Sequence, residues 1–523
     1  MSGQGGAPAG PAHAHRGGRA AHRFLIAANV VVALLLVASG LVYGYTRYTI
    51  GHIHTGSSKG LASTGESGVD RKQSYNGLPP ENILLIGNQS RAGQNVNFGN
   101  AALNSSPLAD VIMLLHLDPR DRTASLLSIP RDLFSPMPAG SPVGSWQKIN
   151  AALNDGNLGI NNLVTAIHDD FGITINHYVE VDFNGFLQSV NALNGIRMDF
   201  PERLYDAYSG LDINHTGCQL IHGQQALALV RSRHLQYDPP GVSPSDPAAW
   251  PYDPESDLAR IVRDHTFVKV LATTAEEKGI GNPVTAANFI SAVTNQLTID
   301  PQLKSKLIQL IVRYHTVNPA AAPARTFPVT AVNNYFFDGY NAGDVLFPSQ
   351  PADLHAIRAW DAGSLPTPVQ PRAVEVYDAA NTPGLAARTG AALRADGFHV
   401  SLEAEGRDPG SVSETVVQYH PGQVPMGFAV LEKLNGAVVM QASKSVPAGT
   451  VIVQAGTTFS VQSPTTPTTP TTGTTAPASS TSSTAAGGGT PTSTTTTTTV
   501  PTPGGQIPTS AQDQVTPYDP RPC

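Results

Sequence analysis

Short apolar runs separated by turns begin near residue 81 and set the pattern of the following segment. NILLIG at 82–87, DVIMLLHL at 110–117 and TASLLSI at 123–129 are almost continuously apolar. Such runs are typical of strands that are buried on both faces of a sheet. The sequence Asp-Pro-Arg-Asp at 118–121 is a turn, so we expect the second and third strands to pair as a hairpin.

Helical and strand patterns then alternate. Apolar residues at 160, 163, 164, 167 and 171 form one stripe of a helix, and HYVEVDF at 177–183 alternates as a half-buried strand does. A helix over 183–193 and a strand over 196–200 are predicted next. Strands interleaved with helices predict a layered α/β domain.

The stretch 223–234, GQQALALVRSRH, is the first candidate for chemistry. It predicts a short helix over 224–230 that runs into Arg231 and Arg233. Alternate side chains of an extended backbone share a face, so both guanidinium groups can point at one target. Guanidinium offers planar, bidentate donors that suit phosphate or pyrophosphate. An arbitrary pair of arginines at this spacing more commonly bridges surface carboxylates. The neighbouring motifs must therefore decide whether this pair binds phosphate.

A second candidate surface lies on the helix predicted to begin at Asp257, capped by Ser256. At 100° per residue, Asp257, Arg260 and Asp264 fall within a sector of roughly 60°. A polar sector with both signs of charge is usually a solvated salt-bridge face. It can also line a site where arginines hold phosphate and carboxylates hold a metal ion.

The N-terminal part of the chain has a different character. Residues 1–23 are predicted to be a disordered cytoplasmic segment. The uncharged apolar run 24–45 is long enough to span a bilayer, and the arginines before it place the N-terminus in the cytoplasm. A retained anchor is favoured over a cleaved signal peptide because no clear A-x-A site follows. Residues 46–80 are a predicted linker, so the bulk of the chain is expected to be extracellular.

Two further units and a tail are predicted outside the membrane. The first extracellular domain is expected over 81–361, and a proline-rich boundary at 366–371 follows it. Residues 372–460 predict a small second α/β domain without a catalytic constellation. Residues 463–523 are rich in Thr, Pro and Ser and are predicted to form an extended, disordered tail.

Composition and cysteine content exclude some functions. The 523 residues carry a net charge of −7 with 14% charged residues, so no basic field favours nucleic acid. Two cysteines, Cys218 and Cys523, exclude a disulfide framework and a Cys-rich metal site. One disulfide between them is compatible with an extracellular location, although Cys523 ends the tail that is predicted to be mobile.

Seven motifs in a fixed order carry a resemblance to a known family. They are NILLIGNQSR, ADVIMLLHLDP, SLLSIPRDLF, KINAAL, HYVEVDFNGF, GQQALALVRSRH and DLARIVRD. The series resembles the LytR–CpsA–Psr (LCP) family of cell-wall ligases. The second unit, with GLAARTGAAL and PAGTVIVQAG, resembles the LytR C-terminal domain that accompanies LCP domains, notably in actinobacteria.

The resemblance implies a fold and a reaction. The first domain is expected to be a three-layer α/β/α sandwich with a hydrophobic pocket for a polyprenyl tail. An arginine-lined mouth would bind the lipid pyrophosphate with a divalent cation, usually Mg²⁺. Family members are phosphotransferases that move a glycopolymer from a polyprenyl-pyrophosphate carrier to peptidoglycan and form a phosphodiester. The implied partners are the lipid-linked glycan, peptidoglycan and the cell membrane.

The resemblance also assigns residues. Five arginines match the family's pyrophosphate site: Arg91, Arg131, Arg231, Arg233 and Arg260. Among them Arg131, Arg231 and Arg233 carry the implied catalytic role, and Asp110 matches a carboxylate linked to metal and phosphate. Phosphoryl transfer depends mostly on positioning and charge stabilisation, which such residues supply. Taken alone, Arg131 would be a strand-end arginine that pairs with Asp132.

Three positions depart from the family pattern. Gln89 stands where an acid is usual, Leu108 replaces an arginine, and Asp264 stands where a glutamine is usual. We hypothesise that Gln89 and Asp264 face one pocket and bind the metal ion together with Asp110. The same changes are also explained by drift toward a weak or inactive ligase.

Two other functions are weighed against the transferase. A binding module with this fold would hold polyprenyl-linked glycan or wall polymer without chemistry, as the departures allow. A transcriptional attenuator, a name historically applied to the family, is disfavoured by the predicted anchor and by the lack of a basic DNA-reading helix.

Overall fold

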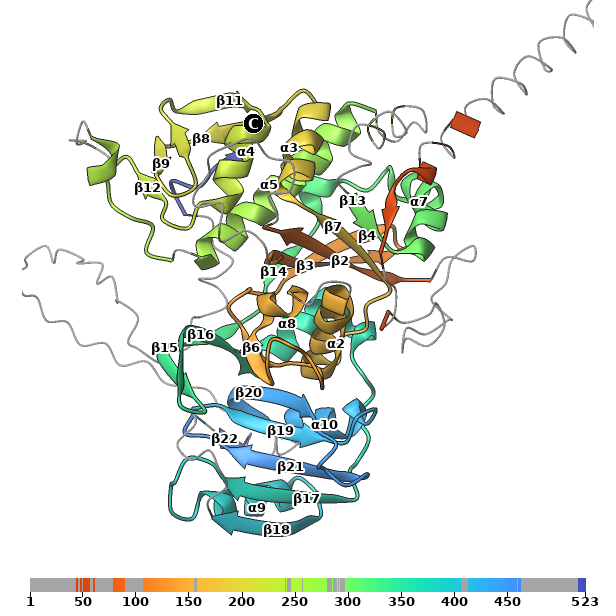
Figure 1. The fold of residues 1–523 in the computed structure, drawn as a ribbon, viewed down its shortest axis with the longest axis vertical. Helices are drawn as coiled ribbons and strands as arrows, with labels where there is room; N and C mark the ends of the chain where they lie inside the picture. The colour runs from red at the N-terminus through yellow and green to blue at the C-terminus, as the bar shows by residue number, and fades with distance from the viewer. Residues whose placement is uncertain are drawn as a thin grey trace, which may run out of the picture.

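A mixed seven-stranded sheet forms the centre of the first domain (Figure 1). The computed structural model describes residues 44–61 in part, then 79–89, 107–154, 158–239, 246–255, 257–279, 297–405, 413–458 and 516–523, with residues 241, 285, 289, 291 and 460–461 between them. The strands lie in the order β1 (His54–Thr55), β13 (Leu297–Ile299), β7 (His177–Val181), β2 (Glu81–Asn88), β3 (Ala109–Asp118), β4 (Thr123–Ser128) and β14 (Ala324–Thr326).

The apolar runs form the central strands, as the sequence predicts. β2 pairs antiparallel with β3 and parallel with β7, and Leu84 lies opposite Leu114 in the first pairing. β3 and β4 form the predicted hairpin, whose turn is closed by the carboxylate of Asp118, which accepts the N–H of Arg120 at 2.7 Å. These central strands are apolar throughout because helices cover both of their faces.

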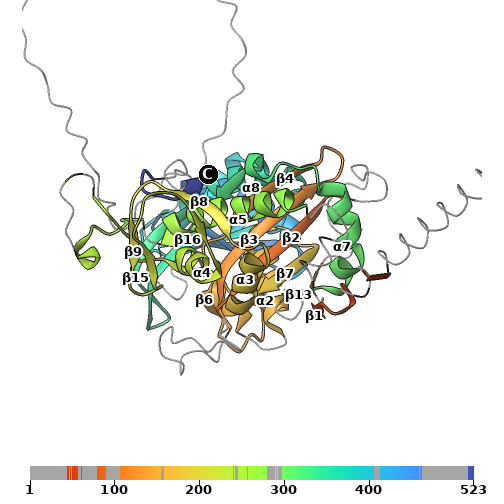
Figure 2. The same cartoon turned by 90° about the horizontal axis from the view of Figure 1, so that it is seen from above.

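Helices cover the sheet on both sides, so the mixed α/β fold is confirmed. One face carries α3 (Phe183–Ala192), α4 (Gly223–Arg231), α5 (Asp257–Glu277) and α7 (Pro301–Tyr314), and the other carries α2 (Gly159–Phe171) and α8 (Ala352–Asp361). Figure 2, seen from the helix side, shows α3, α4 and α5 on the viewer's side of the central sheet. Asp182 caps α3 by accepting the N–H of Gly185 at 2.7 Å, which places the start of this helix directly after β7.

Small sheets extend the first domain beyond the helices. One contains β11 (Gly217–Ile221), β8 (Ile196–Phe200) and β23 (Arg521–Pro522), and another contains β10 (Leu211–Ile213), β9 (Leu204–Asp206) and β12 (Gln236–Tyr237). A two-stranded hairpin is formed by β5 (Phe134–Pro136) and β6 (Trp146–Lys148). Loops at the β10–β9–β12 sheet hold the end of α4 that carries the arginine.

The second unit is built on an eight-stranded sheet. Its strands are β15 (Val329–Phe337), β16 (Tyr340–Gln350), β20 (Leu434–Ala442), β19 (Thr415–Tyr419), β21 (Thr450–Ala455), β17 (Ala373–Asp378), β18 (Val400–Glu405) and β22 (Ser460–Val461), and its helices are α9 (Leu385–Ala395) and α10 (Val424–Leu431). The β15–β16 hairpin precedes the boundary predicted at residue 361, yet it joins this sheet because Ser349 pairs with Ala437. Tyr419 Oη donates to Asp169 O at 2.9 Å, and one apolar core runs across both units.

The predicted anchor and most of the tail lie outside the described residues. In the part of the chain that the structure describes, no helix is both long enough and apolar enough to cross a membrane. The span predicted over 24–45 falls almost entirely beyond that part, as do residues 463–515 of the tail.

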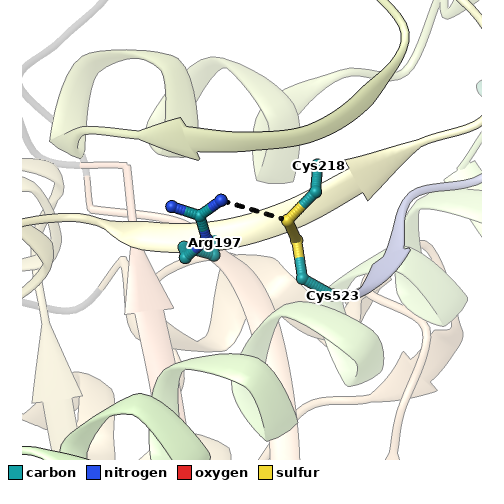
Figure 3. Close-up of a disulfide and its surroundings, with 3 residues drawn as sticks. All are labelled: Arg197, Cys218 and Cys523. Atoms are coloured by element: carbon teal, nitrogen blue, oxygen red, sulfur yellow. Dashed lines mark hydrogen bonds between the residues drawn. A yellow bond between two sulfur atoms is a disulfide. The ribbon is translucent and has the colours of Figure 1, made fainter.

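The end of the tail corrects the prediction of disorder up to residue 523. β23 pairs antiparallel with β8, and Cys523 forms a disulfide with Cys218 (Figure 3). The ring of Tyr518 also stacks on Tyr237 with centroids 3.9 Å apart. The Thr/Pro/Ser composition of the tail gives no sign of this short ordered segment. Its order depends on partners that lie about 300 residues earlier in the chain.

Cys523→Ser removes this cross-link and is expected to lower the free energy of unfolding by about 2–5 kcal/mol, because the unfolded chain regains freedom. Denaturant unfolding with and without reductant measures the loss. Cys218→Ser is the matched control and should give the same loss, with no further loss in the double variant. Equal stability of the variant and the unsubstituted protein under oxidising conditions would contradict the cross-link.

Candidate functional site

An apolar cavity of about 270 Å³ lies between the sheet and the helices α3, α4 and α5. Most of its lining is apolar and includes Leu85, Met113, Val179, Phe183, Phe186, Leu227, Val230, Phe267, Leu271 and Leu297. Four charged residues that the sequence singled out line the same cavity: Asp110, Arg231, Arg260 and Asp264. An apolar interior beside charged side chains suits a ligand with an apolar chain and an ionic group.

Asp257, the first residue of α5, joins three arginines that come from separate parts of the chain. Its carboxylate oxygens lie 2.8 Å from Arg233 Nε, 3.3 Å from Arg260 Nη2 and 3.6 Å from Arg131 Nε. Burial opposes ionisation, but the charges of these arginines outweigh it and hold the pKa of Asp257 below its ordinary value. The first turn of a helix also favours a carboxylate. Asp257 is therefore an anion around which the cations are arranged.

Arg131 lies between carboxylates at the end of β4. Its Nη1 donates to Asp110 Oδ1 at 2.5 Å, and its Nε is 3.4 Å from Asp132 Oδ2. Burial disfavours its charge, but Asp257, Asp110 and Asp132 together raise the pKa of Arg131. Lys148 Nζ lies 3.1 Å from Asp132 Oδ1 and neutralises the outer carboxylate. The expected pairing with Asp132 is thus present, and the same side chain also reaches the cavity-lining Asp110.

Arg231 and Arg233 lie at one site but contact different partners. α4 continues through Arg231, whose guanidinium carbon is 4.6 Å from the centre of the Phe183 ring at the cavity. Arg233 follows one extended residue and pairs with Asp257, with its side chain 39% exposed. The predicted shared face required an extended backbone at both Arg231 and Arg233. The helix α4 ends at Arg231, one residue later than predicted, so only Arg233 follows an extended residue. Arg231 therefore lies on the cavity side and Arg233 on the solvent side.

Asp206 holds the loop that carries Arg233, and sequence reasoning missed it. Its carboxylate is 1% exposed. Its donors are Ser232 Oγ at 2.7 Å, the N–H groups of Arg233 and His234 at 3.1 Å each, and those of Tyr208 at 2.8 Å and Ser209 at 3.2 Å. A buried carboxylate is stable here because donors surround both oxygens. Its only local signal is an acid before a turn, which many surface loops share.

Arg263 supports the same loop from the interior. It is 1% exposed, and its Nη2 donates to Ser232 O at 3.1 Å. Its Nη1 lies 2.6 Å from Asp253 Oδ2 and 3.2 Å from Asp519 Oδ1. Burial disfavours its charge, but Asp253 and Asp519 raise the pKa of Arg263. Because Asp519 belongs to the C-terminal segment, the end of the chain contributes to holding the arginine loop.

The three predicted metal-binding residues are placed differently. Asp110 and Asp264 line the cavity, whereas Gln89 is not among its lining residues. Gln89 follows β2, where its backbone N–H donates to Leu108 O at 3.1 Å. Its role in metal binding stays a prediction, and Arg91 lies outside the described residues.

The carboxylates of Asp110 and Asp264 fit a cation that arrives with phosphate. Asp264 is 5% exposed, and its Oδ1 is buried without a hydrogen-bond partner. Burial raises the pKa of Asp264 to about 7, against the opposing charges of Arg260 and Arg263. Among the described residues no three acidic, His or Cys side chains form a metal-ligand group. Mg²⁺ commonly needs only one or two carboxylates when phosphate supplies further oxygens.

Comparison with known proteins places the chain in a family. Residues 50–351 match the LytR–CpsA–Psr family, and residues 372–459 match a family described as LytR cell envelope-related transcriptional attenuator. Because the first match covers more than half of the chain, the protein belongs to the LytR–CpsA–Psr family, as its motifs predict.

Individual relatives come from cell-wall biosynthesis. The probable cell wall biosynthesis protein LcpB of Corynebacterium glutamicum is 31% identical over 223 residues, which is 42% of this chain and 48% of that protein. The polyisoprenyl-teichoic acid–peptidoglycan teichoic acid transferase TagV of Bacillus subtilis is 36% identical over 130 residues, 24% of this chain and 32% of that protein. The chain thus spans half or less of these two relatives. The solved LytR-Csp2A-Psr enzyme from Actinomyces oris aligns with a TM-score of 0.43 at 21% identity, covering 60% of this chain and 97% of that one.

Asp264→Asn is expected to stabilise the protein at high pH. A carboxyl whose folded pKa is about 7, above its ordinary 3.8, stabilises the fold fully below the lower value and loses that contribution as the pH rises through about 7. Asparagine stays neutral, so at about pH 8 the variant should be more stable by on the order of 2–4 kcal/mol, with no difference below about pH 4.

Denaturant unfolding at both pH values, without divalent cations, measures this difference. Asp212→Asn, an exposed aspartate on β10, is the control and should change little at either pH. A variant that is no more stable than the unsubstituted protein at the higher pH would show that Asp264 is not held in an unfavourable environment.

Proposed function

We propose that this protein is a membrane-anchored phosphotransferase that moves a glycopolymer from a polyprenyl-pyrophosphate carrier to peptidoglycan. The observation that carries the proposal is the joint lining of one cavity by apolar side chains and by Arg231, Arg260 and Asp110. A polyprenyl chain would occupy the apolar part, and its pyrophosphate would lie at the arginines. Family membership and the transferase name of the relative TagV support the reaction class. The predicted span over 24–45 would place the site next to the lipid carrier.

The proposed reaction transfers a glycosyl phosphate. A hydroxyl oxygen of peptidoglycan attacks the phosphorus that bears the glycan, and the bond from this phosphorus to the bridging oxygen breaks. The products are a glycan–peptidoglycan phosphodiester and a lipid monophosphate, which takes up the hydroxyl proton. Negative charge accumulates on the leaving lipid phosphate, so fixed guanidinium groups nearby lower the barrier.

Each cation has a distinct task in this proposal. Arg231, on the cavity side, would hold the phosphate next to the lipid. Arg131 and Arg233 would face the phosphate that bears the glycan, because Asp257 holds both at one point. Arg260 donates to Asp110 O at 3.0 Å and would keep β3 in place beside the phosphates. A divalent cation, Mg²⁺ or another, would be held by Asp110 and Asp264 and would supply further charge neutralisation.

A binding module without turnover is the second candidate. The observation that favours it is the 2.5 Å contact of Arg131 with Asp110, which already engages one predicted metal ligand. Leu108 and Gln89 also stand where the family pattern supplies charged groups, an arginine and an acid. Such a module would hold the lipid-linked glycan at the same cavity.

Alanine at Arg231 is expected to reduce kcat/KM for transfer by about 10²–10³-fold, because a fixed cation is lost where charge develops. The assay uses the full chain in detergent with a short prenyl-pyrophosphate-linked glycan, peptidoglycan and Mg²⁺. Arg388→Ala, an exposed arginine on α9, is the matched control and should retain activity. Tight binding of the donor by the unsubstituted protein, with no product at any cation concentration, would instead establish the binding module.

Removal of divalent cations with a chelator is expected to abolish transfer, and added Mg²⁺ should restore it. Asp110→Asn should raise the Mg²⁺ concentration that gives half-maximal activity by about tenfold or more, because a carboxylate ligand is lost. The measurement is a Mg²⁺ titration of the initial rate. Full activity in excess chelator would remove the cation from the proposal while leaving the arginines in place.

A further inference from the structure

Tyr208 and His234 form an aromatic pair at the edge of the arginine cluster. Tyr208 lies in the turn between β9 and β10, and its side chain is 76% exposed. Its ring packs on the ring of the exposed His234 with centroids 4.5 Å apart and an interplanar angle of 39°. A single exposed tyrosine is ordinary on a protein surface. The two exposed rings differ from such a tyrosine because a buried carboxylate holds their loops together and because His234 directly follows Arg233.

Asp206 holds the backbone of both residues. Its Oδ1 accepts the N–H of Tyr208 at 2.8 Å, and its Oδ2 accepts the N–H of His234 at 3.1 Å. The turn is closed by the N–H of Gly210, which donates to Asp206 O at 2.9 Å with a φ of 78°, a conformation that favours glycine. One buried carboxylate therefore holds the two loops together, and the rings are positioned without any ligand. Positioning in advance reduces the entropy that binding must overcome.

The aromatic pair continues a line of chemically distinct surfaces. Arg231 lines the apolar cavity, and Arg233 lies two residues further along the chain, with its Nε 2.8 Å from Asp257. His234 follows Arg233 directly in sequence, and neither His234 nor Tyr208 is among the residues that line the cavity. Along the chain the order is thus a cavity-lining arginine, an arginine of the charge cluster and an exposed ring that packs on a second one. A ligand that matches this order has an apolar chain, then phosphate, then a group with both an apolar face and polar edges.

We propose that the aromatic pair of Tyr208 and His234 binds a sugar ring of the glycan at the transferred phosphate. The proposal rests on the proposed function, because it is the phosphate at Arg233 that brings the sugar to the rings. A pyranose presents a face of C–H groups that packs on an aromatic ring, while its hydroxyls stay at the edge. The Tyr208 hydroxyl and the His234 ring nitrogens are groups that can form hydrogen bonds with those hydroxyls.

The sugar can come from either of two sources that share this chemistry: the glycan on the donor pyrophosphate or the acceptor strand of peptidoglycan. Three probes distinguish them in titration calorimetry with the full chain in detergent. The first is geranylgeranyl pyrophosphate, which carries no sugar. The second is the same lipid with one N-acetylglucosamine on its pyrophosphate, and the third is a soluble oligosaccharide of N-acetylglucosamine and N-acetylmuramic acid.

Tyr208→Ala is the main variant, because it keeps the backbone N–H that Asp206 accepts and removes only the exposed ring. It is expected to weaken binding of one sugar-bearing probe by about tenfold and to leave the dissociation constant of the sugar-free lipid unchanged. Weakening with the second probe assigns the pair to the donor glycan, and weakening with the third assigns it to the acceptor. Tyr208→Phe and Tyr208→Trp keep a ring and should restore most of the affinity.

Two controls separate this proposal from a loss of structure. Leu402→Ala removes an exposed apolar side chain on β18, in the second unit, and should leave all three affinities unchanged. The melting temperature of Tyr208→Ala should also equal that of the unsubstituted protein.

Three results would overturn the proposal. Unchanged binding of both sugar probes in Tyr208→Ala would exclude a sugar contact. Equal weakening of the sugar-free lipid would show that the ring only supports the arginine cluster. If the unsubstituted protein binds neither lipid, the proposed function fails. The oligosaccharide titration alone then decides whether the pair binds sugar.

Discussion

Three guanidinium groups meet at the carboxylate of Asp257, and the arrangement of the site depends on that contact. Arg131 comes from the end of β4, Arg233 from the loop after α4, and Arg260 from the next turn of α5. Cations at such short separation repel one another strongly where water is partly excluded. A partly buried anion between them removes that repulsion and fixes their directions before any ligand binds. The same contact joins three elements, so the charge centre is also a tertiary anchor for α5.

Much of the fold follows from local patterns in the sequence. The strands at 82–87, 110–117 and 123–129 are predicted correctly because continuous apolar runs with a strong turn between them allow few alternatives. The pairing of the β15–β16 hairpin with the sheet of the second unit is not predicted, since strand partners such as Ser349 and Ala437 are far apart in sequence. The end of the tail is missed for the same reason. Periodicity records which face of an element is buried but not the distant element that covers it.

The residues of the candidate site also fall into two groups: those that local sequence patterns predict and those that depend on distant contacts. The motifs and the family resemblance lead to Arg131, Arg231, Arg233, Asp110 and Asp264. The residues that orient them are not found in this way, because Asp206 acts on a loop 26 residues later and Asp519 acts on Arg263 from the end of the chain. The direction of Arg231 depends on where α4 ends, and a helix end that is one residue later changes the partner of the side chain. Residue types at a site are therefore more predictable than their contacts.

The presence of Asp264, where the family pattern has a glutamine, has a physical consequence for how the site would accept the proposed pyrophosphate. A glutamine would be neutral at every pH, whereas Asp264 is buried beside Asp110 and has a pKa of about 7. With its carboxyl ionised, Asp264 adds a negative charge next to the proposed position of the anionic ligand, which would disfavour binding. Either a proton or a divalent cation removes this repulsion, and only the cation also attracts the phosphates. In the proposed function, Asp264 would thus make the site depend more strongly on a cation than a glutamine would, beside an Asp110 that Arg131 already neutralises.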